Sequence, residues 1–234
     1  MNSCLIFGVA HAGNHLIIRL MDLIGLAQYH HIAKEGNERL FTIPQQGYQQ
    51  FMFCLHYQEK WETMFNSCGI HGIYIIRDPR DVAISIARTY AYDNDSNFDN
   101  ELFRQLSTIA DRFELQDGWR FNDNIYTTTF ENLVGDYGGG NKISQSNEIL
   151  NMCSHLDYNC DKVKLEYIQD NLYNNRSFHL ERIPADYPTK FLGGKIGNWK
   201  RLFNSKHNEL WASQLDGSKC LQEIMNLLKD DHDR

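Results

Sequence analysis

The stretch Ile73-Tyr-Ile-Ile-Arg-Asp-Pro-Arg-Asp-Val-Ala-Ile-Ser85 decides the fold of this 234-residue chain. Its β-branched and aromatic start predicts a buried strand that ends at Arg77, and Asp-Pro then opens a helix that carries Ser85. Asp78 is a good N-cap, and Pro79 suits the first helical position. A guanidinium and a hydroxyl are therefore expected at the carboxyl end of a strand, beside a helix amino terminus, where open α/β sheets bind anions.

The spacing within this stretch has two interpretations. Arg77, Asp81 and Ser85 are four residues apart, so we expect them to share one stripe of the helix and to line a site. A βα unit with a surface arginine and a capping aspartate, and no ligand at all, explains the same local pattern. The stretch alone does not separate the two.

The flanking sequence predicts strands that alternate with helices over the first 130 residues. Alternation of this kind implies an α/β fold, a three-layer α/β/α arrangement with a central, mainly parallel sheet and right-handed crossovers. No linker or repeat divides the chain, so we expect a single domain spanning residues 1–234. Strands are expected at 4–9, 51–55, 72–76 and 125–130, helices at 57–68, 78–92, 98–115, 144–156, 160–173 and 207–229, an irregular polar segment at 28–50 and a glycine-rich loop at 134–140.

Between the first strand and the helix that follows it lies Ala10-His-Ala-Gly-Asn-His15. The next apolar residues fall at helical spacing, so the chain passes through a tight, glycine-containing turn straight into a helix. The first amides of such a helix point back at the turn and form an anion cradle. A tight βα turn without a ligand is the simpler alternative.

Composition limits the function. The net charge of -7 argues against a nucleic-acid partner, which needs an extended basic surface. Six cysteines show neither Cys-x-x-Cys pairs nor zinc spacing with histidines, so we expect no metal site. No stretch approaches the roughly 18 apolar residues of a membrane span, and the first apolar run is too short for a signal peptide. These features predict a cytoplasmic protein, or the soluble part of a longer one, without a membrane partner.

A second glycine-rich segment, Gly193-Gly-Lys-Ile-Gly-Asn-Trp-Lys-Arg-Leu-Phe203, lies near the carboxyl end. Together with the 10–16 turn and the 77–85 segment, in this order, it resembles the PAPS-dependent sulfotransferases, a P-loop-like α/β family. PAPS, 3′-phosphoadenosine 5′-phosphosulfate, is the sulfate donor, and PAP is the product. The 77–85 segment is similar to the 3′-phosphate motif of that family, and 193–203 to its carboxy-terminal Gly-x-x-Gly-Asp-Trp-Lys segment.

The resemblance implies a site on the nucleotide. Arg77 and Ser85 would bind the 3′-phosphate, with Gly193, Gly194 and Lys195 closing over it. The 10–16 turn occupies the place of the 5′-phosphosulfate loop, which implies that His11, Ala12, Gly13, Asn14 and His15 face that group. Within this loop, Gly13 would let the backbone approach the ligand closely.

Two weaker matches extend the resemblance. Phe130-Glu-Asn-Leu133 resembles the Tyr-Glu-Asp-Leu that follows a late strand in the family, which makes Phe130 a candidate to pack near adenine, as is Phe178. His56 lies where cytosolic members carry a catalytic histidine, so the resemblance implies that it is the general base. A core aromatic and a surface or core histidine are the respective alternatives.

The chain also departs from the family pattern. Where the first loop of the family has Lys, this chain has His11, which supplies charge if it is protonated and otherwise only a hydrogen bond. Ala12, Asn14 and His15 stand in place of the usual hydroxyls. Leu192-Gly-Gly194 replaces an Arg-Lys-Gly, and Lys195 is then the nearest cation. Trp199 is expected to anchor the closing segment, with Lys200-Arg201 as a solvated basic pair.

Three functions compete on this basis. The first is an active sulfotransferase that moves the sulfuryl group of PAPS, in line, to a hydroxyl or amine of a small-molecule or glycan acceptor, with His56 as base and His11 assisting. The second is a catalytically weak or inactive relative that binds PAP or PAPS. The third, a P-loop nucleotide kinase or NTPase, lacks Gly-x-x-x-x-Gly-Lys-[Ser/Thr].

Overall fold

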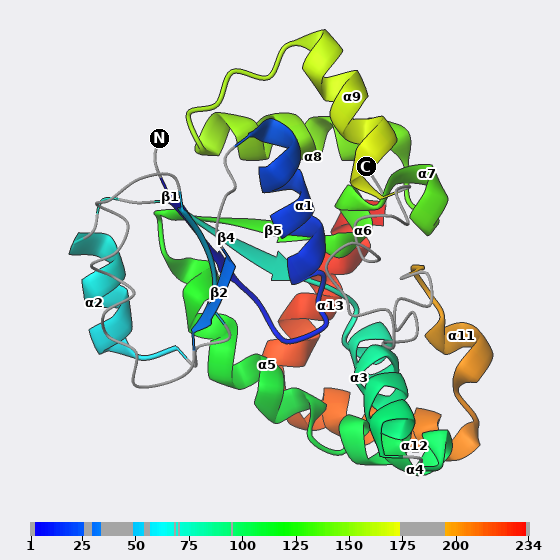
Figure 1. Ribbon diagram of the computed structural model, residues 1–234. Helices are drawn as coiled ribbons and strands as arrows, with labels where there is room; N and C mark the ends of the chain where they lie inside the picture. Colours follow the sequence, from blue (N-terminus) through cyan, green and yellow to red (C-terminus); the bar gives the residue numbers. More distant parts are fainter. Residues whose placement is uncertain are drawn as a thin grey trace.

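The computed structural model describes residues 3–25, 30–33, 49–53, 57–67, 69, 71–94, 96–173 and 195–232. Its centre is a sheet of five strands in the order β2-β3-β1-β4-β5, with helices on both faces (Figure 1). All the strand pairs are parallel, as expected. The strands are β1 Ser3–Phe7, β2 His30–Ala33, β3 Gln49–Phe53, β4 His71–Ile76 and β5 Ile125–Thr129.

The helices gather on two sides of this sheet. Figure 1 shows α1, α8 and α9 on one side of the sheet and α5 with α13 on the other. The helices α3, α4, α11 and α12 lie beyond the carboxyl end of β4. The helices are α1 Asn14–Ile24, α2 Glu59–Ser67, α3 Pro79–Asp93, α4 Phe98–Leu106, α5 Ile109–Asp117, the 3-10 helix η3 Gly118–Phe121, α6 Phe130–Leu133, α7 Gly135–Gly138, α8 Lys142–His155, α9 Lys162–Leu172, α11 Trp199–Leu202, α12 Ser205–Gly217 and α13 Lys219–His232.

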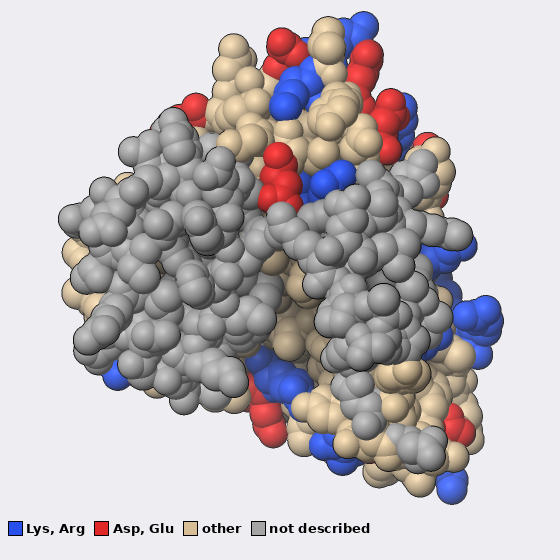
Figure 2. Space-filling view, in the orientation of Figure 1, with Lys and Arg blue, Asp and Glu red and all other residues tan. Residues whose placement is uncertain are grey.

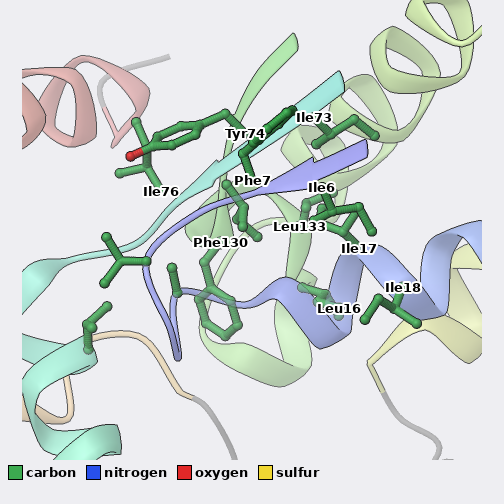
Figure 3. Close-up of a cluster of buried hydrophobic side chains, with 14 of the residues drawn as sticks. Ile6, Phe7, Leu16, Ile17, Ile18, Ile73, Tyr74, Ile76, Phe130 and Leu133 are labelled. Carbon is green, nitrogen blue, oxygen red and sulfur yellow. The ribbon is translucent and has the colours of Figure 1, made fainter. Parts of the chain in front are cut away.

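The core forms where β1 and β4 are covered by helices. Ile73 and Tyr74 of β4 are completely buried, as is Ile6 on the adjacent strand β1 (Figure 3). Phe7 stacks on Trp119 with ring centroids 4.4 Å apart, which fixes η3 against the sheet. Strands buried on both faces are typical of a parallel sheet between helices and explain the continuous apolar runs in the sequence.

The structure corrects the expectation for residues 28–50, where an irregular polar segment was predicted. Part of that segment, His30–Ala33, is strand β2, and it pairs in parallel with β3. Pairing at a sheet edge overrides a weak local β-propensity, because strand formation depends mainly on neighbours. The expected loop at 134–140 likewise contains a short helix, α7.

Two expected long helices are each divided by hydroxyl side chains. The 98–115 helix is α4 and α5, separated where Ser107 and Thr108 donate to the carbonyls of Arg104 (2.9 Å) and Gln105 (3.4 Å). The 207–229 helix is α12 and α13, separated at Ser218, whose hydroxyl accepts the N–H of Leu221. Such side chains compete with the backbone ladder, a local effect that apolar periodicity does not show.

No helix in the described part of the chain is both long and apolar enough to cross a membrane.

Candidate functional site

The candidate site lies at the carboxyl edge of two adjacent strands. β1 and β4 run parallel, with Phe7 opposite Tyr74, so the loop after β1 and the turn after β4 emerge side by side. The first leads into α1 and the second into α3. Asp78 caps α3 by accepting the N–H of Arg80 at 2.9 Å, and Pro79 opens the helix, as the sequence predicts.

Arg77, the last residue before this cap, is 5% exposed, and its guanidinium lies 4.1 Å from the centroid of the Phe130 ring. Its two terminal nitrogens donate to the carbonyl oxygens of His11 (3.4 Å) and Lys195 (3.5 Å), and its Nε has no partner among the described residues. Both contacts are long, and no carboxylate within the described ranges forms an ion pair with it. Because a buried guanidinium is costly without a strong acceptor, this group favours a bound anion.

Ser85 and His11 meet across the gap between α3 and the first loop. The Ser85 hydroxyl and His11 Nδ1 are 3.1 Å apart. His11 has a φ of 71°, in the left-handed region that non-glycine residues rarely adopt. The backbone at His11 thus turns its carbonyl to Arg77 and its ring to Ser85, and the two predicted site segments form one unit.

The remaining loop residues differ in accessibility. Gly13 is the N-cap of α1 with a φ of 119°, and no side chain caps the helix there. Ala12 is completely buried, and Asn14 is also buried, with its amide nitrogen donating to Val9 O at 3.4 Å within the loop. His15 is exposed on the first turn of α1. His15 therefore faces outward, while Ala12 and the Asn14 side chain support the loop.

Phe130 has a structural position under this loop. It is 2% exposed, and Figure 3 shows its ring against the loop that joins β1 to α1. A Cβ on Gly13 would lie 2.7 Å from Phe130 Cδ2 and 2.9 Å from Ile75 Cδ1. The glycine is therefore required by packing against an aromatic ring, a reason that the sequence does not reveal.

Asp81 connects α3 to the carboxy-terminal segment. Its carboxylate accepts the N–H groups of Gly197 at 2.7 Å and Trp199 at 3.0 Å, and the residue is 1% exposed. Burial raises the pKa of Asp81, as does Asp78, whereas Arg77 and the two N–H groups lower it. The residues around Lys195 are thereby held over Arg77. The sequence predicts that Asp81 lies on the same helix stripe as Arg77 and Ser85, but it does not indicate the hydrogen bonds to the carboxy-terminal segment.

Glu131 supports the turn from below. It is 5% exposed and follows Phe130 in the chain, its Oε1 accepts the N–H of Asp78 at 3.0 Å, and its Oε2 has no partner among the described residues. Burial raises the pKa of Glu131 to about 7, with Asp78 acting in the same direction and its N–H bond and Arg77 opposing. Sequence analysis missed this role, since Glu131 appeared only within a motif match.

Four predicted site residues, His56, Phe178, Gly193 and Gly194, lie outside the described residues. Lys195 is described and exposed, and it contributes its carbonyl to Arg77. Within the described ranges, no three His, Cys, Asp or Glu side chains are grouped as a metal site requires.

Charge on the face shown in Figure 2 is mixed rather than uniformly basic. Figure 2 shows acidic and basic side chains next to one another over α9, with basic side chains gathered near α7 and α11. This distribution accords with the net charge of -7 and with recognition of a compact anion in one local site.

No protein-family model and no curated protein matches this sequence. Solved structures do match it. Mouse sulfotransferase SULT7A1 complexed with PAP has a TM-score of 0.67 at 16% identity, covering 96% of this chain and 88% of its own. Retinol dehydratase with androsterone and the inactive cofactor PAP has a TM-score of 0.64 at 14% identity, covering 93% of this chain and 81% of its own. Its complex with retinol and PAP gives 0.63 at 15%, covering 93% and 82%.

Proposed function

This chain has the fold of the PAPS-dependent sulfotransferases, and we propose that it transfers the sulfuryl group of PAPS to a hydroxyl or amine of a small-molecule acceptor. One observation carries the proposal. A buried Arg77 without a carboxylate partner among the described residues lies beside the Ser85–His11 pair, at the strand edge where this fold binds ligands. The neighbours with this fold were solved with PAP bound.

The residues present fit a ribose 3′-phosphate. Arg77 presents an unpartnered Nε and two nitrogens with only long bonds, so a phosphate gives it a far stronger acceptor. Ser85 adds a hydroxyl, and the segment at Lys195 covers the site because Asp81 holds it there. The amides at the start of α1, which no side chain caps, would then bind the 5′-phosphosulfate.

PAPS supplies an activated sulfuryl group: the bond between sulfur and the acceptor atom forms as the bond between sulfur and the 5′-phosphate oxygen breaks. The protein must position the acceptor, take its proton and stabilise charge on the departing phosphate. We assign His56 as the base that takes the proton of the acceptor, because of its position in the sequence after the second predicted strand. His11, protonated, takes the charge-stabilising role of the lysine absent from its loop.

The class of acceptor is suggested by the ligands of the structurally similar proteins rather than by residues of this chain. Retinol dehydratase was solved with androsterone and with retinol, both small molecules. A small-molecule acceptor is therefore the better supported part of the sequence prediction, and a glycan acceptor has no support of this kind. The mixed charge on the face shown in Figure 2 and the net charge of -7 also give no reason to expect a polyanionic acceptor.

Nucleotide binding and turnover are tested separately. PAP should raise the Tm of the full chain, by an amount equivalent to about 2.7 kcal/mol at a hundred times its Kd, whereas ATP with magnesium should not. Arg77→Ala should abolish the PAP shift, while Arg104→Ala, an exposed arginine on α4, should keep it. An unchanged PAP shift in Arg77→Ala would contradict the site.

Transfer from PAPS to a panel of small hydroxyl and amine acceptors then decides between the active enzyme and the binding relative. Sulfated product in any acceptor reaction supports the enzyme. Tight PAP binding without product on the whole panel would favour the non-catalytic alternative.

A further inference from the structure

A histidine closes the capping box at the start of α12. The Asn204 side chain accepts the N–H of His207 at 3.1 Å, and Nδ1 of His207 accepts the N–H of Asn204 at 3.3 Å. The third helical position of such a box is usually Glu or Gln, whose side chains remain acceptors at neutral pH. Here the acceptor is an imidazole, the side chain that ordinarily changes charge between pH 5 and 8.

This capping box requires a neutral His207 ring. Nδ1 can accept the Asn204 N–H only while it carries no proton, so the ring proton is on Nε2. Protonation would set two N–H groups against each other. It would also bury a cation at a helix amino terminus, in a residue that is 2% exposed. As pH falls, protonation of the ring therefore favours an open box.

Among the described residues, no group is placed to stabilise a protonated His207. The ring contacts Asn204 and the Phe203 ring, whose centroid is 5.7 Å away. Arg80 brings a cation to the same side of α12, since its guanidinium lies 5.4 Å from the ring of Trp211, one turn after His207. The charged side chains described on the helices packed against α12 are each exposed or bonded to another residue. They are Asp99, Glu101 and Arg104 on α4, Asp111, Arg112, Glu114 and Asp117 on α5, and Lys219, Glu223 and Lys229 on α13.

The capping box is connected to the candidate site through α11, which packs against α3 (Figure 1). The Phe203 ring, which lies against His207, is 6.0 Å from the ring of Trp199, and the N–H of Phe203 donates to the Trp199 carbonyl at 2.9 Å. Asp81 in turn accepts the N–H of Trp199 at 3.0 Å. The carboxy-terminal segment that covers Arg77 is thus held in two places, by Asp81 at the start of α11 and by His207 after its end.

We infer that His207 is a positioning residue whose neutral ring holds the carboxy-terminal segment over Arg77 and whose protonation releases it, so that nucleotide binding weakens as pH falls. The inference rests on the proposed function, which supplies the nucleotide, and adds a pH-dependent control of the same site. His207 acts through Phe203 and Trp199 rather than by contact with the ligand.

The test compares the wild type with His207→Gln, whose amide oxygen can accept the Asn204 N–H at every pH. Calorimetric titration of the full chain with PAP at pH 8 should give Kd values within about twofold of each other. At pH 5.5 the wild type should bind PAP about fivefold more weakly than His207→Gln, the factor that corresponds to loss of one helix cap. His207→Ala has no acceptor and should bind PAP more weakly than His207→Gln at both pH values.

Comparison at one pH cancels the groups that titrate alike in both proteins. These include the phosphates of PAP and Glu131, whose pKa burial raises to about 7. His155→Gln is the matched control, since it removes a histidine whose Nε2 lies 3.1 Å from Gly72 O, at the amino end of β4 and so at the opposite edge of the sheet from the site. It should keep the pH dependence of the wild type.

Amide hydrogen exchange without nucleotide gives a second readout. At pH 5.5 the N–H groups of Asn204 and Trp199 should exchange about fivefold faster in the wild type than in His207→Gln, and at pH 8 at equal rates. Where His207→Gln impairs folding, which the ligand-free Tm reports, the Asn204 amide resonance of the wild type decides, because it should move between pH 8 and pH 5.5 as the box opens.

The outcomes separate this inference from the proposed function. Equal PAP binding by the wild type and His207→Gln at pH 5.5, equal exchange at that pH, or an Asn204 resonance that does not move overturns the inference alone. A wild type that binds no PAP at pH 8 overturns the proposed function and with it the role of His207 in nucleotide binding.

Discussion

The guanidinium carbon of Arg80 lies 3.5 Å from the centroid of the Trp199 ring, which fastens α11 to the amino terminus of α3. Asp78 holds Arg80 from the other side through two bonds of 2.9 and 2.7 Å, and the Trp211 ring lies 5.4 Å from the same guanidinium. A guanidinium can donate hydrogen bonds to a carboxylate from its edge while its flat face stacks on an indole ring. The carboxy-terminal segment is therefore packed against the start of α3, beside Arg77.

Asp81→Asn should loosen this segment without unfolding the chain. One carboxylate accepts from both Gly197 and Trp199, whereas an asparagine has one carbonyl oxygen and turns its amide toward the second N–H. Amide hydrogen exchange at these two residues should accelerate by about tenfold or more, and PAP binding should weaken by a similar factor.

Asp99→Asn is the control for Asp81→Asn, because it removes the same charge from an exposed position on α4. Exchange at Gly197 and Trp199 should be unchanged in it. Equal exchange rates in the Asp81 variant and the wild type would show that the carboxylate does not hold the segment.

Glu131→Gln should remove a pH dependence of stability. The pKa of Glu131 is raised from 4.5 to about 7 in the folded chain, first by burial. Below pH 4.5 both states are protonated; as pH rises toward 7 the unfolded state loses its proton first, so stability falls. The difference of 2.5 pKa units corresponds to about 3 kcal/mol at 1.36 kcal/mol per unit.

Urea unfolding at pH 5 and pH 8 measures this effect. The wild type should lose stability between the two pH values, and Glu131→Gln should lose markedly less, because its amide does not ionise while still accepting from the Asp78 N–H. Parallel losses in the two proteins would assign the pH dependence to another group.

Capping residues and apolar spacing in the sequence predicted the part of the site that is formed by residues close together in the chain. The β4–α3 turn, with Asp78 as cap and Pro79 as first helical residue, needs only neighbouring residues and was predicted correctly. The parallel sheet also followed, because apolar runs alternate with amphipathic helices. Strand β2 was missed because its stability comes from pairing with β3 rather than from its own residues.

Contacts between distant segments were beyond local reasoning. Asp81 shows its spacing within α3, but its partners Gly197 and Trp199 come from the other end of the chain. Such roles depend on tertiary packing, which hydrophobic periodicity and capping residues do not encode.

His56→Ala separates binding from chemistry. If His56 is the base, its loss should lower sulfuryl transfer by about 10²–10⁴-fold while leaving the PAP-induced Tm shift intact, because the proton acceptor does not hold the nucleotide. Initial rates with PAPS and an accepted acceptor, measured beside the Tm shift, give both readouts. Transfer at the wild-type rate would require another base.

Gly13→Ala should destabilise the chain far more than Gly25→Ala, although both glycines have positive φ and flank α1. The new Cβ at Gly13 meets Phe130 and Ile75 at under 3 Å, whereas nothing lies within 4 Å of the Cβ position at Gly25. Backbone strain costs about 1–2 kcal/mol at Gly25, whose φ of 81° lies near the left-handed region, and more at Gly13, whose φ is 119°, so Gly25→Ala should lose only that smaller amount, measured by urea unfolding. Gly13→Ala should lose at least about 1 kcal/mol more, as overpacking does, and Phe130→Leu should restore part of that excess. Equal losses at the two glycines would mean that the Phe130 ring does not fix the loop.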